Sequence, residues 1–242
     1  MIESLNRRHI RRLIELRAQE RAAGSALNLT LTNPVFMNFL EHARQYHTSS
    51  RSRHLTDLVA SYFLGSEKRF LEIGAAHPKD GSDTFLLETE FNWNGIQVEP
   101  NPKLAQQLIE ARTSTVLNSA LVGRARQGSN LFLNLDKGTL NSKRGFKVST
   151  QTLEQVVEKF GTDFQACFID IEGGEPEIIE DLVFSQIPFD FIAIERIWNS
   201  TLICERLESL GFVNVFGEIS GYESWWLSSG LFKEKFRFKP KS

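Results

Sequence analysis

Between residues 168 and 177 the sequence reads Phe168-Ile169-Asp170-Ile171-Glu172-Gly173-Gly174-Glu175-Pro176-Glu177. Apolar residues lead into this stretch, two glycines permit a sharp turn, and the proline suits the first turn of a helix. The pattern predicts a buried strand from Ala166 to Ile171, a tight turn, and a helix from Pro176 to Leu182. Such a strand would deliver the carboxylates of Asp170 and Glu172 to its carboxyl end.

Short apolar runs alternate with helical patterns along most of the chain. This alternation is typical of parallel strands joined by right-handed helical crossovers. The last two expected strands follow one another without a helix between them, so the sheet should end in an antiparallel pair. We therefore predict an α/β fold, a Rossmann-like doubly wound sheet that is mostly parallel with an antiparallel end. Strands are expected over residues 69–74, 95–100, 114–121, 131–135, 166–171, 189–195, 212–216 and 222–227, and helices over residues 3–23, 54–63, 83–91, 102–112, 152–160, 176–182 and 201–210, with a further helix beginning after Asn33-Pro34.

The first part of the chain contains helical patterns and no strand pattern. We therefore expect an N-terminal helical extension over residues 1–66, followed by a ligand-binding α/β domain over residues 67–242. The helices of the extension could cover the site, pack beside the sheet, or pair with a second subunit. In the last case the protein would be a homo-oligomer.

The overall composition is that of an ordinary globular protein. The chain has 242 residues, 41% of them hydrophobic, and its 28 Lys and Arg against 30 Asp and Glu give a formal net charge of −2. This balance does not demand a polyanionic partner. The two cysteines, Cys167 and Cys204, make neither a disulfide framework nor a zinc site, so we expect a reducing cytoplasm. No apolar run reaches the roughly 18–20 residues that span a bilayer.

The turn after the first expected strand, Glu72-Ile73-Gly74-Ala75-Ala76, is a candidate nucleoside site. Small residues let a ligand approach the backbone there, although a plain strand-to-loop turn explains the glycine equally well. The run lacks the pattern G-x-G-x-x-G that binds pyrophosphate, which favours a cofactor without phosphates. Glu99, at the end of the second strand, follows Gly74 at about the spacing of an acid that binds ribose hydroxyls. Asn118 or Ser119, near the end of the third strand, would bond the adenine edge, unless Asn118 only forms a turn.

Several carboxylates are expected at the carboxyl ends of the parallel strands, where the reaction would take place. Asp170 and Glu172 leave one strand and Glu195 leaves the next, so they should meet at the same sheet edge. Crowded carboxylates repel one another unless they share a proton, a cation or a substrate. They could bind a divalent cation, or hold polyol hydroxyls with one acid as general base, or pair with the arginine after Glu195. Glu175 and Glu177 have a simpler alternative role, because a helix dipole favours negative charge in the first turn.

The motifs spaced along residues 68–216 are Leu71-Glu72-Ile73-Gly74-Ala75, Ser82-Asp83-Thr84, Leu87-Glu88, Trp93-Asn94-Gly95, Val98-Glu99-Pro100-Asn101-Pro102 and Phe168-Ile169-Asp170-Ile171-Glu172-Gly173-Gly174-Glu175. Together they resemble the FkbM-type S-adenosylmethionine-dependent methyltransferases. The resemblance implies a class I methyltransferase fold and O-methylation of sugars, polyketides or related natural products. One departure is His77-Pro78-Lys79, where the family would have a small or acidic run. His77 would either face the site as a base or only cap its loop.

The residue patterns and the resemblance together predict a methyltransferase that uses S-adenosylmethionine and methylates a hydroxyl of a small molecule, with a sugar-containing acceptor expected. Asp170, Glu172 and Glu195 are the expected catalytic carboxylates. Asp170 and Glu195 are also the expected ligands of a divalent metal such as Mg²⁺. The expected cofactor contacts are Glu72, Gly74, Ala75, Glu99, Pro100, Asn118, Ser119 and Asp170, and the expected acceptor contacts are His77, Glu175 and Trp198.

Three other functions fit parts of the sequence. An NAD-dependent oxidoreductase would share the fold, but it needs the glycine-rich pyrophosphate turn that this sequence lacks. A non-catalytic nucleotide-binding module would bind ligand without methyl transfer. An RNA methyltransferase is suggested by the basic helix around Arg7, Arg8, Arg11 and Arg12 and by the tail over residues 233–241. The slightly negative net charge and the lack of a stacking motif make nucleic acid an unexpected partner.

Overall fold

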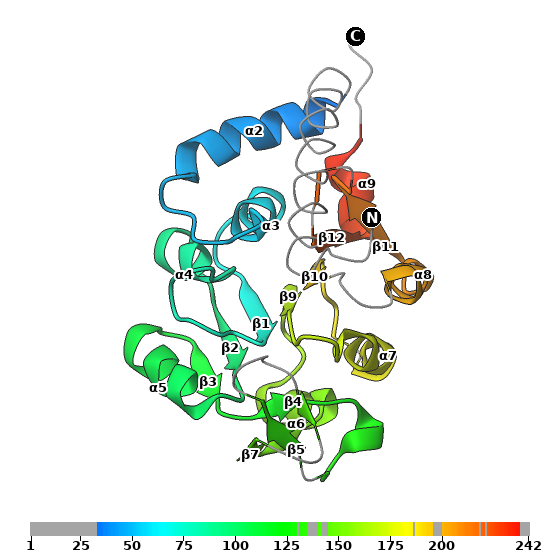
Figure 1. Cartoon of the computed structure of the whole chain (residues 1–242). Helices are drawn as coiled ribbons and strands as arrows, with labels where there is room; N and C mark the ends of the chain where they lie inside the picture. The colour runs from blue at the N-terminus through cyan, green and yellow to red at the C-terminus, as the bar shows by residue number, and fades with distance from the viewer. Residues whose placement is uncertain are drawn as a thin grey trace, which may run out of the picture.

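The computed structural model describes residues 33–129, 131–134, 140–141, 145–185, 187–195, 200–217, 219–220 and 222–237. The helix predicted over residues 3–23 and the predicted acceptor contact Trp198 lie outside these ranges. Within them, no helix is both long enough and apolar enough to cross a membrane. The chain forms a central sheet with helices on both faces (Figure 1).

Seven strands form the central sheet, in the order β11 (Phe212–Val215), β12 (Glu223–Ser228), β10 (Phe191–Glu195), β9 (Ala166–Ile169), β1 (Arg69–Ile73), β2 (Asn94–Val98) and β3 (Thr115–Leu117). Neighbouring strands are parallel except at β12, which runs antiparallel to both β10 and β11. The strand order reverses at β1, because β2 and β3 lie on one side of it and β9 and β10 on the other. The predicted doubly wound, Rossmann-like sheet with an antiparallel end is confirmed.

Helices pack on both faces of the sheet (Figure 1). The face that we call the α3 face carries α2 (Pro34–Tyr46), α3 (Thr56–Leu64), α4 (Phe85–Phe91) and α9 (Ser229–Lys235), and the α7 face carries α6 (Leu153–Phe160), α7 (Glu175–Ser185) and α8 (Ser200–Ser209). Helix α5 (Pro102–Ala111) contacts β3. The side chain of Asn33 caps α2, as the sequence predicted, by accepting from the backbone N–H groups of Val35 and Phe36. Helix α9 had not been predicted.

Alternating burial along the strands decides which side chains reach which face. In β10, Phe191 and Ala193 join the core on the α3 face, whereas Ile192 and Ile194 join the core on the α7 face. The same alternation directs four acids at the strand ends toward the α3 face. Glu72 follows Phe70 by two positions, Asp170 follows Phe168, Glu195 follows Ala193, and Glu223 precedes Trp225.

The region between β3 and α6 differs from the single strand predicted over residues 114–121. The chain leaves the central sheet after β3 and turns where the Asn118 amide donates to the backbone carbonyl of Glu99 at 2.9 Å. That prediction was wrong because a side chain that bonds nearby backbone ends the strand. The chain continues as β4 (Ala120–Leu121), paired with β8 (Thr150–Gln151), and as a small sheet of β5 (Leu131–Leu133), β6 (Leu140–Asn141) and β7 (Phe146–Val148).

Candidate active site

A cavity of about 200 Å³ lies at the carboxyl ends of β1, β9 and β10. The start of β12 and the residues ahead of α3 close its other side. Open α/β sheets bind ligands at this edge, beside the point where the strand order reverses. Of the residues that the sequence predicted for the site, the cavity is lined by Glu72, Gly74, Ala75, His77, Asp170, Glu172 and Glu195.

Gly74 forms the turn that brings β1 against the end of β9. Its φ is +89°, and a Cβ added there would lie 1.8 Å from the backbone oxygen of Asp170. Its N–H donates to the carbonyl of Val98 at 2.9 Å, which also ties the turn to β2. The close approach of protein backbone therefore requires glycine here, independently of any ligand. The same turn lines the cavity, so the prediction that a nucleoside approaches it remains open to test.

Glu99 lies directly behind the glycine turn and does not itself line the cavity. Its carboxylate accepts from the N–H of Ala76 at 2.8 Å and from the N–H of Asn101 at 2.7 Å. Burial raises the pKa of Glu99, and repulsion from Asp170 adds to that shift. A carboxylate has about four acceptor positions, so two remain for ribose hydroxyls. Ala76 connects this acid to the cavity wall.

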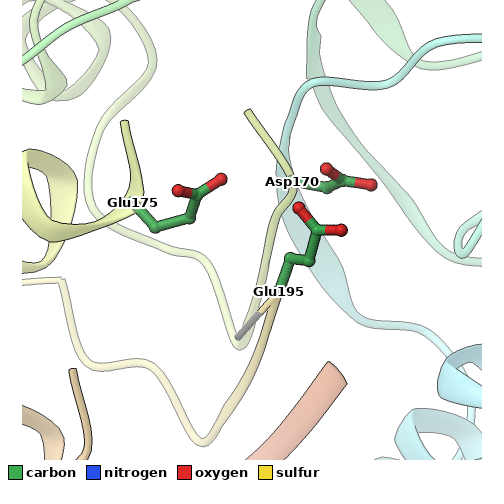
Figure 2. A group of neighbouring side chains, drawn as sticks. All are labelled: Asp170, Glu175 and Glu195. Carbon is green, nitrogen blue, oxygen red and sulfur yellow. The ribbon is translucent and has the colours of Figure 1, made fainter. Parts of the chain in front are cut away.

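Asp170 and Glu195 form a hydrogen-bonded pair of carboxyl groups (Figure 2). Asp170 is accessible from the cavity, but the surrounding protein still partly desolvates its carboxyl group. Burial, followed by repulsion from Glu172 and Glu175, raises the pKa of Asp170 to about 6. Burial, followed by repulsion from Asp170, raises the pKa of Glu195 to about 8. At neutral pH the two carboxyl groups therefore titrate as one coupled pair that holds about one proton between them.

The turn after β9 is held by Glu175. This side chain is 1% exposed, and its carboxylate accepts from the N–H of Ile171 at 3.0 Å and from the N–H of Gly173 at 2.9 Å. Glu172 lies inside this turn with a φ of +55°, and it is exposed. The structure thus assigns Glu175 a local role in shaping the turn, close to the helix-start alternative that the sequence left open.

Asp170, Glu175 and Glu195 each offer a carboxylate oxygen, and these oxygens lie within 4.8 Å of one another (Figure 2). Hard divalent cations prefer such oxygen ligands. The oxygens of Glu175 also accept from backbone N–H groups, so fewer of their acceptor positions remain than on Asp170 and Glu195. Asp170 and Glu195 are the residues that the sequence predicted as metal ligands, and their binding of a cation stays a prediction.

A second group of acids on the cavity wall was missed by sequence reasoning. Asp83, before α4, and Glu223, at the start of β12, share a hydrogen bond. Glu223 is 4% exposed and also accepts from the hydroxyl of Thr56 in α3. Burial raises the pKa of Glu223 to about 7, and burial followed by repulsion from Glu223 raises that of Asp83 well above its usual range. Only the tertiary fold brings these segments together.

Glu72 belongs to a buried polar network behind the cavity. It accepts from Thr84 at 2.8 Å and from the Gln97 amide at 2.5 Å. Arg112, which follows α5, donates to Thr84 at 2.8 Å and forms an ion pair with Glu88. Burial raises the pKa of Glu72. The network anchors the loop between β1 and α4, so Glu72 supports the predicted cofactor site from behind.

Three further predicted residues are His77, which lines the cavity, and Asn118 and Ser119, which do not. The His77 ring accepts from the N–H groups of Lys79 and Asp80, so it caps its loop, although it also lines the cavity. Asn118 forms the turn described above, and it donates to Pro100 as well at 3.2 Å. Ser119 is 2% exposed, and within the described residues its hydroxyl has no partner.

A second cavity of about 100 Å³ lies on the other side of the turn after β9. Leu121 and Val122 line one wall, and Gly173 and Gly174 line another. Glu172 lines both cavities. Its wall also contains Arg126 and Glu177, which form an ion pair at 3.3 Å.

No protein-family model matches this sequence, and no curated protein sequence matches it. Similar solved structures include a TehB-like SAM-dependent methyltransferase from Corynebacterium glutamicum, with 9% identity, a TM-score of 0.42, and coverage of 79% of this chain and 97% of that one. Another is MtNAS in complex with MTA and tNA, with 10% identity, a TM-score of 0.44, and coverage of 91% and 74%. A third is the O-methyltransferase from Bacillus cereus in complex with SAH, with 12% identity, a TM-score of 0.40, and coverage of 87% and 100%. These similarities are weak, so the strand order and directions described above define the fold.

Proposed function

We propose that this chain is an S-adenosylmethionine-dependent O-methyltransferase that acts on a hydroxyl of a small molecule, with a sugar-containing natural product as the acceptor class. The observation that carries this proposal is a single cavity that joins Gly74, Asp170 and Glu195 at the ends of three neighbouring parallel strands. A glycine turn and paired acids at this edge suit a nucleoside cofactor beside a proton-accepting group.

The charge of the cavity favours a cationic cofactor over one that carries phosphates. A pyrophosphate or an RNA backbone would meet a repulsive field there, whereas a sulfonium and an ammonium group would be attracted. This supports S-adenosylmethionine over NAD, and a small acceptor over RNA. Among the described residues the wall carries one arginine, Arg53, and seven carboxylates, on Glu72, Asp80, Asp83, Asp170, Glu172, Glu195 and Glu223.

The nucleoside part of the cofactor would lie across the ends of β1, β2 and β9. Glu99 keeps acceptor positions for the ribose hydroxyls, as argued above. The second cavity shares Glu172 with the first, and the apolar side chains of Leu121, Val122 and Ile171 form a part of its wall that suits a flat base. The unpartnered hydroxyl of Ser119, after β3, is a donor and acceptor for the adenine edge.

When bound, S-adenosylmethionine supplies an electrophilic methyl group for an in-line displacement. The residues of this chain would align the acceptor hydroxyl, exclude water and receive its proton. Asp170 is the proposed base, because it is reachable from the cavity and is largely ionised at neutral pH. Glu195 holds the proton of the pair and orients Asp170 by their hydrogen bond.

A divalent cation between Asp170 and Glu195 would relieve the same repulsion that the shared proton relieves. In that case the two carboxylates would hold the metal, which would polarise the acceptor oxygen. We propose the shared proton as the working state. Methyl transfer that survives EDTA supports the proton, and strict dependence on added Mg²⁺ supports the metal.

The function is tested by titration calorimetry with S-adenosylhomocysteine and with NAD, followed by transfer of tritiated methyl groups to a panel of sugar glycosides. We expect binding of S-adenosylhomocysteine and none of NAD. Asp170→Asn should bind S-adenosylhomocysteine with an affinity close to that of the original chain and lose turnover by about 10²- to 10⁴-fold, the range for a general base. Binding of NAD, or near-normal turnover by Asp170→Asn, contradicts the proposal.

A further inference from the structure

The segment ahead of α3 is held rigidly over the cavity. Asp57, which is fully buried, accepts from the hydroxyl of Ser50 at 2.8 Å and from the N–H groups of Arg51 and Ser52. Ser52 also forms a parallel β-bridge with Gly81, in the loop between β1 and α4. These contacts fix the backbone immediately before Arg53 against the cavity wall.

The Arg53 side chain extends along this wall over Gly81. A Cβ added to Gly81 would lie 2.8 Å from Nε of Arg53, and Gly81 has a φ of +79°. The absence of a side chain at this position therefore leaves room for the guanidinium to lie flat. Arg53 lines the cavity, and within the described residues no hydrogen bond or ion pair engages it.

Among the residues that the structure describes, an anionic group that enters this cavity meets one cationic side chain, that of Arg53. Every other side chain in the described wall that carries a full charge at neutral pH is a carboxylate. His54 is next to Arg53, but burial, followed by repulsion from Arg53, lowers its pKa, so it stays neutral. His77 uses its ring nitrogen to cap its own loop. A carboxylate placed elsewhere in the cavity would face only repulsion.

We infer that Arg53 binds the α-carboxylate at the methionine end of the cofactor, while the surrounding acids accept hydrogen bonds from its ammonium group and attract its sulfonium. This inference rests on the proposed use of S-adenosylmethionine. Guanidinium and carboxylate match in a two-pronged, charge-assisted hydrogen bond, which Lys reproduces only in part. The site thus offers the carboxylate of the amino-acid end a cation, on the segment ahead of α3, and offers its cationic groups the acids at the ends of β1, β9 and β10.

The test compares two ligands that differ only in this carboxylate, S-adenosylhomocysteine and its decarboxylated analogue S-adenosyl-3-thiopropylamine. Their dissociation constants are measured by calorimetry for the original chain, for Arg53→Gln and Arg53→Lys, and for Lys79→Gln as a control. Lys79 is an exposed cation on the neighbouring loop and does not line the cavity. Melting temperatures of all variants verify that each one is folded.

We expect Arg53→Gln to weaken the binding of S-adenosylhomocysteine by about 10- to 100-fold, the range of a hydrogen bond to a charged group. The same substitution should weaken the binding of the decarboxylated analogue by less than about twofold. Arg53→Lys should recover part of the lost affinity, and Lys79→Gln should leave the dissociation constants of both ligands unchanged. Equal weakening of both ligands by Arg53→Gln, or no weakening, overturns the inference. If the original chain binds neither ligand, the proposed function itself is wrong, which is a separate outcome.

Discussion

The substitution Glu223→Gln tests whether the cavity walls hold acids that the fold keeps from ionising. Glu223 is 4% exposed and lies between Thr56 and Asp83. Glutamine keeps the shape of the side chain and an oxygen that accepts from Thr56. It removes the ability to ionise, so the change isolates the cost of a buried negative charge.

The expected change in the free energy of unfolding follows from the pKa of Glu223, which rises from 4.5 to about 7 in the folded protein. Because the folded state holds the proton more tightly, this group stabilises the fold most below pH 4.5. That contribution is lost as the pH rises through about 7. Each pKa unit is worth about 1.4 kcal/mol, so the loss is about 3 kcal/mol at pH 8 and about 1 kcal/mol at pH 5.

Glu223→Gln should therefore stabilise the protein, and by more at pH 8 than at pH 5. For a chain of this size, 1 kcal/mol corresponds to about 2–4 °C in melting temperature, so the gain at pH 8 is about 6–12 °C. The assay is differential scanning calorimetry at both pH values. Glu208→Gln, at an exposed site in α8, is the matched control and should change neither value. A melting temperature that falls at pH 8, or a gain equal at both pH values, refutes the reasoning.

Three further substitutions test the parts that shape the site. Gly74→Ala places a Cβ against the backbone of Asp170 and should cost more than about 3 kcal/mol of unfolding free energy. Gly65→Ala has open space around it and should cost only the strain of its positive-φ backbone, about 1–3 kcal/mol, so equal losses in urea titration contradict the close-approach argument. Arg112→Met should cost about 3–5 kcal/mol because it leaves Glu88 buried without its partner, and adding Glu88→Gln should recover much of that loss in the same titration. Glu175→Gln should speed amide hydrogen exchange at the turn after β9, because an amide NH₂ cannot accept from backbone N–H groups; unchanged exchange there would show that the turn does not need this acid.

The sequence was enough to predict the sheet and much of the cavity wall. Two sequence signals made this prediction possible. One is the set of apolar runs that end near Gly74 or Asp170, and the other is the helical periodicity between these runs. Parallel strands bring their carboxyl ends to one edge, so acids that follow different strands could be expected to meet. Asp170 and Glu195 do so, and they form the hydrogen-bonded pair at the centre of the cavity.

The parts that escaped prediction depend on contacts between distant segments. Glu223 reaches the cavity only because β12 inserts antiparallel beside β10, with Glu195 opposite Glu223 in the register. Arg112 joins the network behind Glu72 through a loop far away in sequence. Local competition explains other differences, because the Asn118 side chain ended a strand that residue propensity would have continued.

The proposed role of Arg53 was also beyond sequence reasoning, since Arg53 lies before residues 68–216, which carry the motifs used in the sequence analysis. Its position over the cavity depends on Gly81 and on the buried carboxylate of Asp57. No local pattern around Arg53 marks it as different from the other arginines of the chain.

A crystal structure of the protein with S-adenosylhomocysteine tests the central claim most directly. We predict that the nucleoside lies across the ends of β1, β2 and β9, with its ribose at Glu99 and its sulfur in the cavity beside Asp170 and Glu195. Ligand density away from these strand ends, or its absence from crystals soaked well above the dissociation constant measured in solution, would contradict the proposed site.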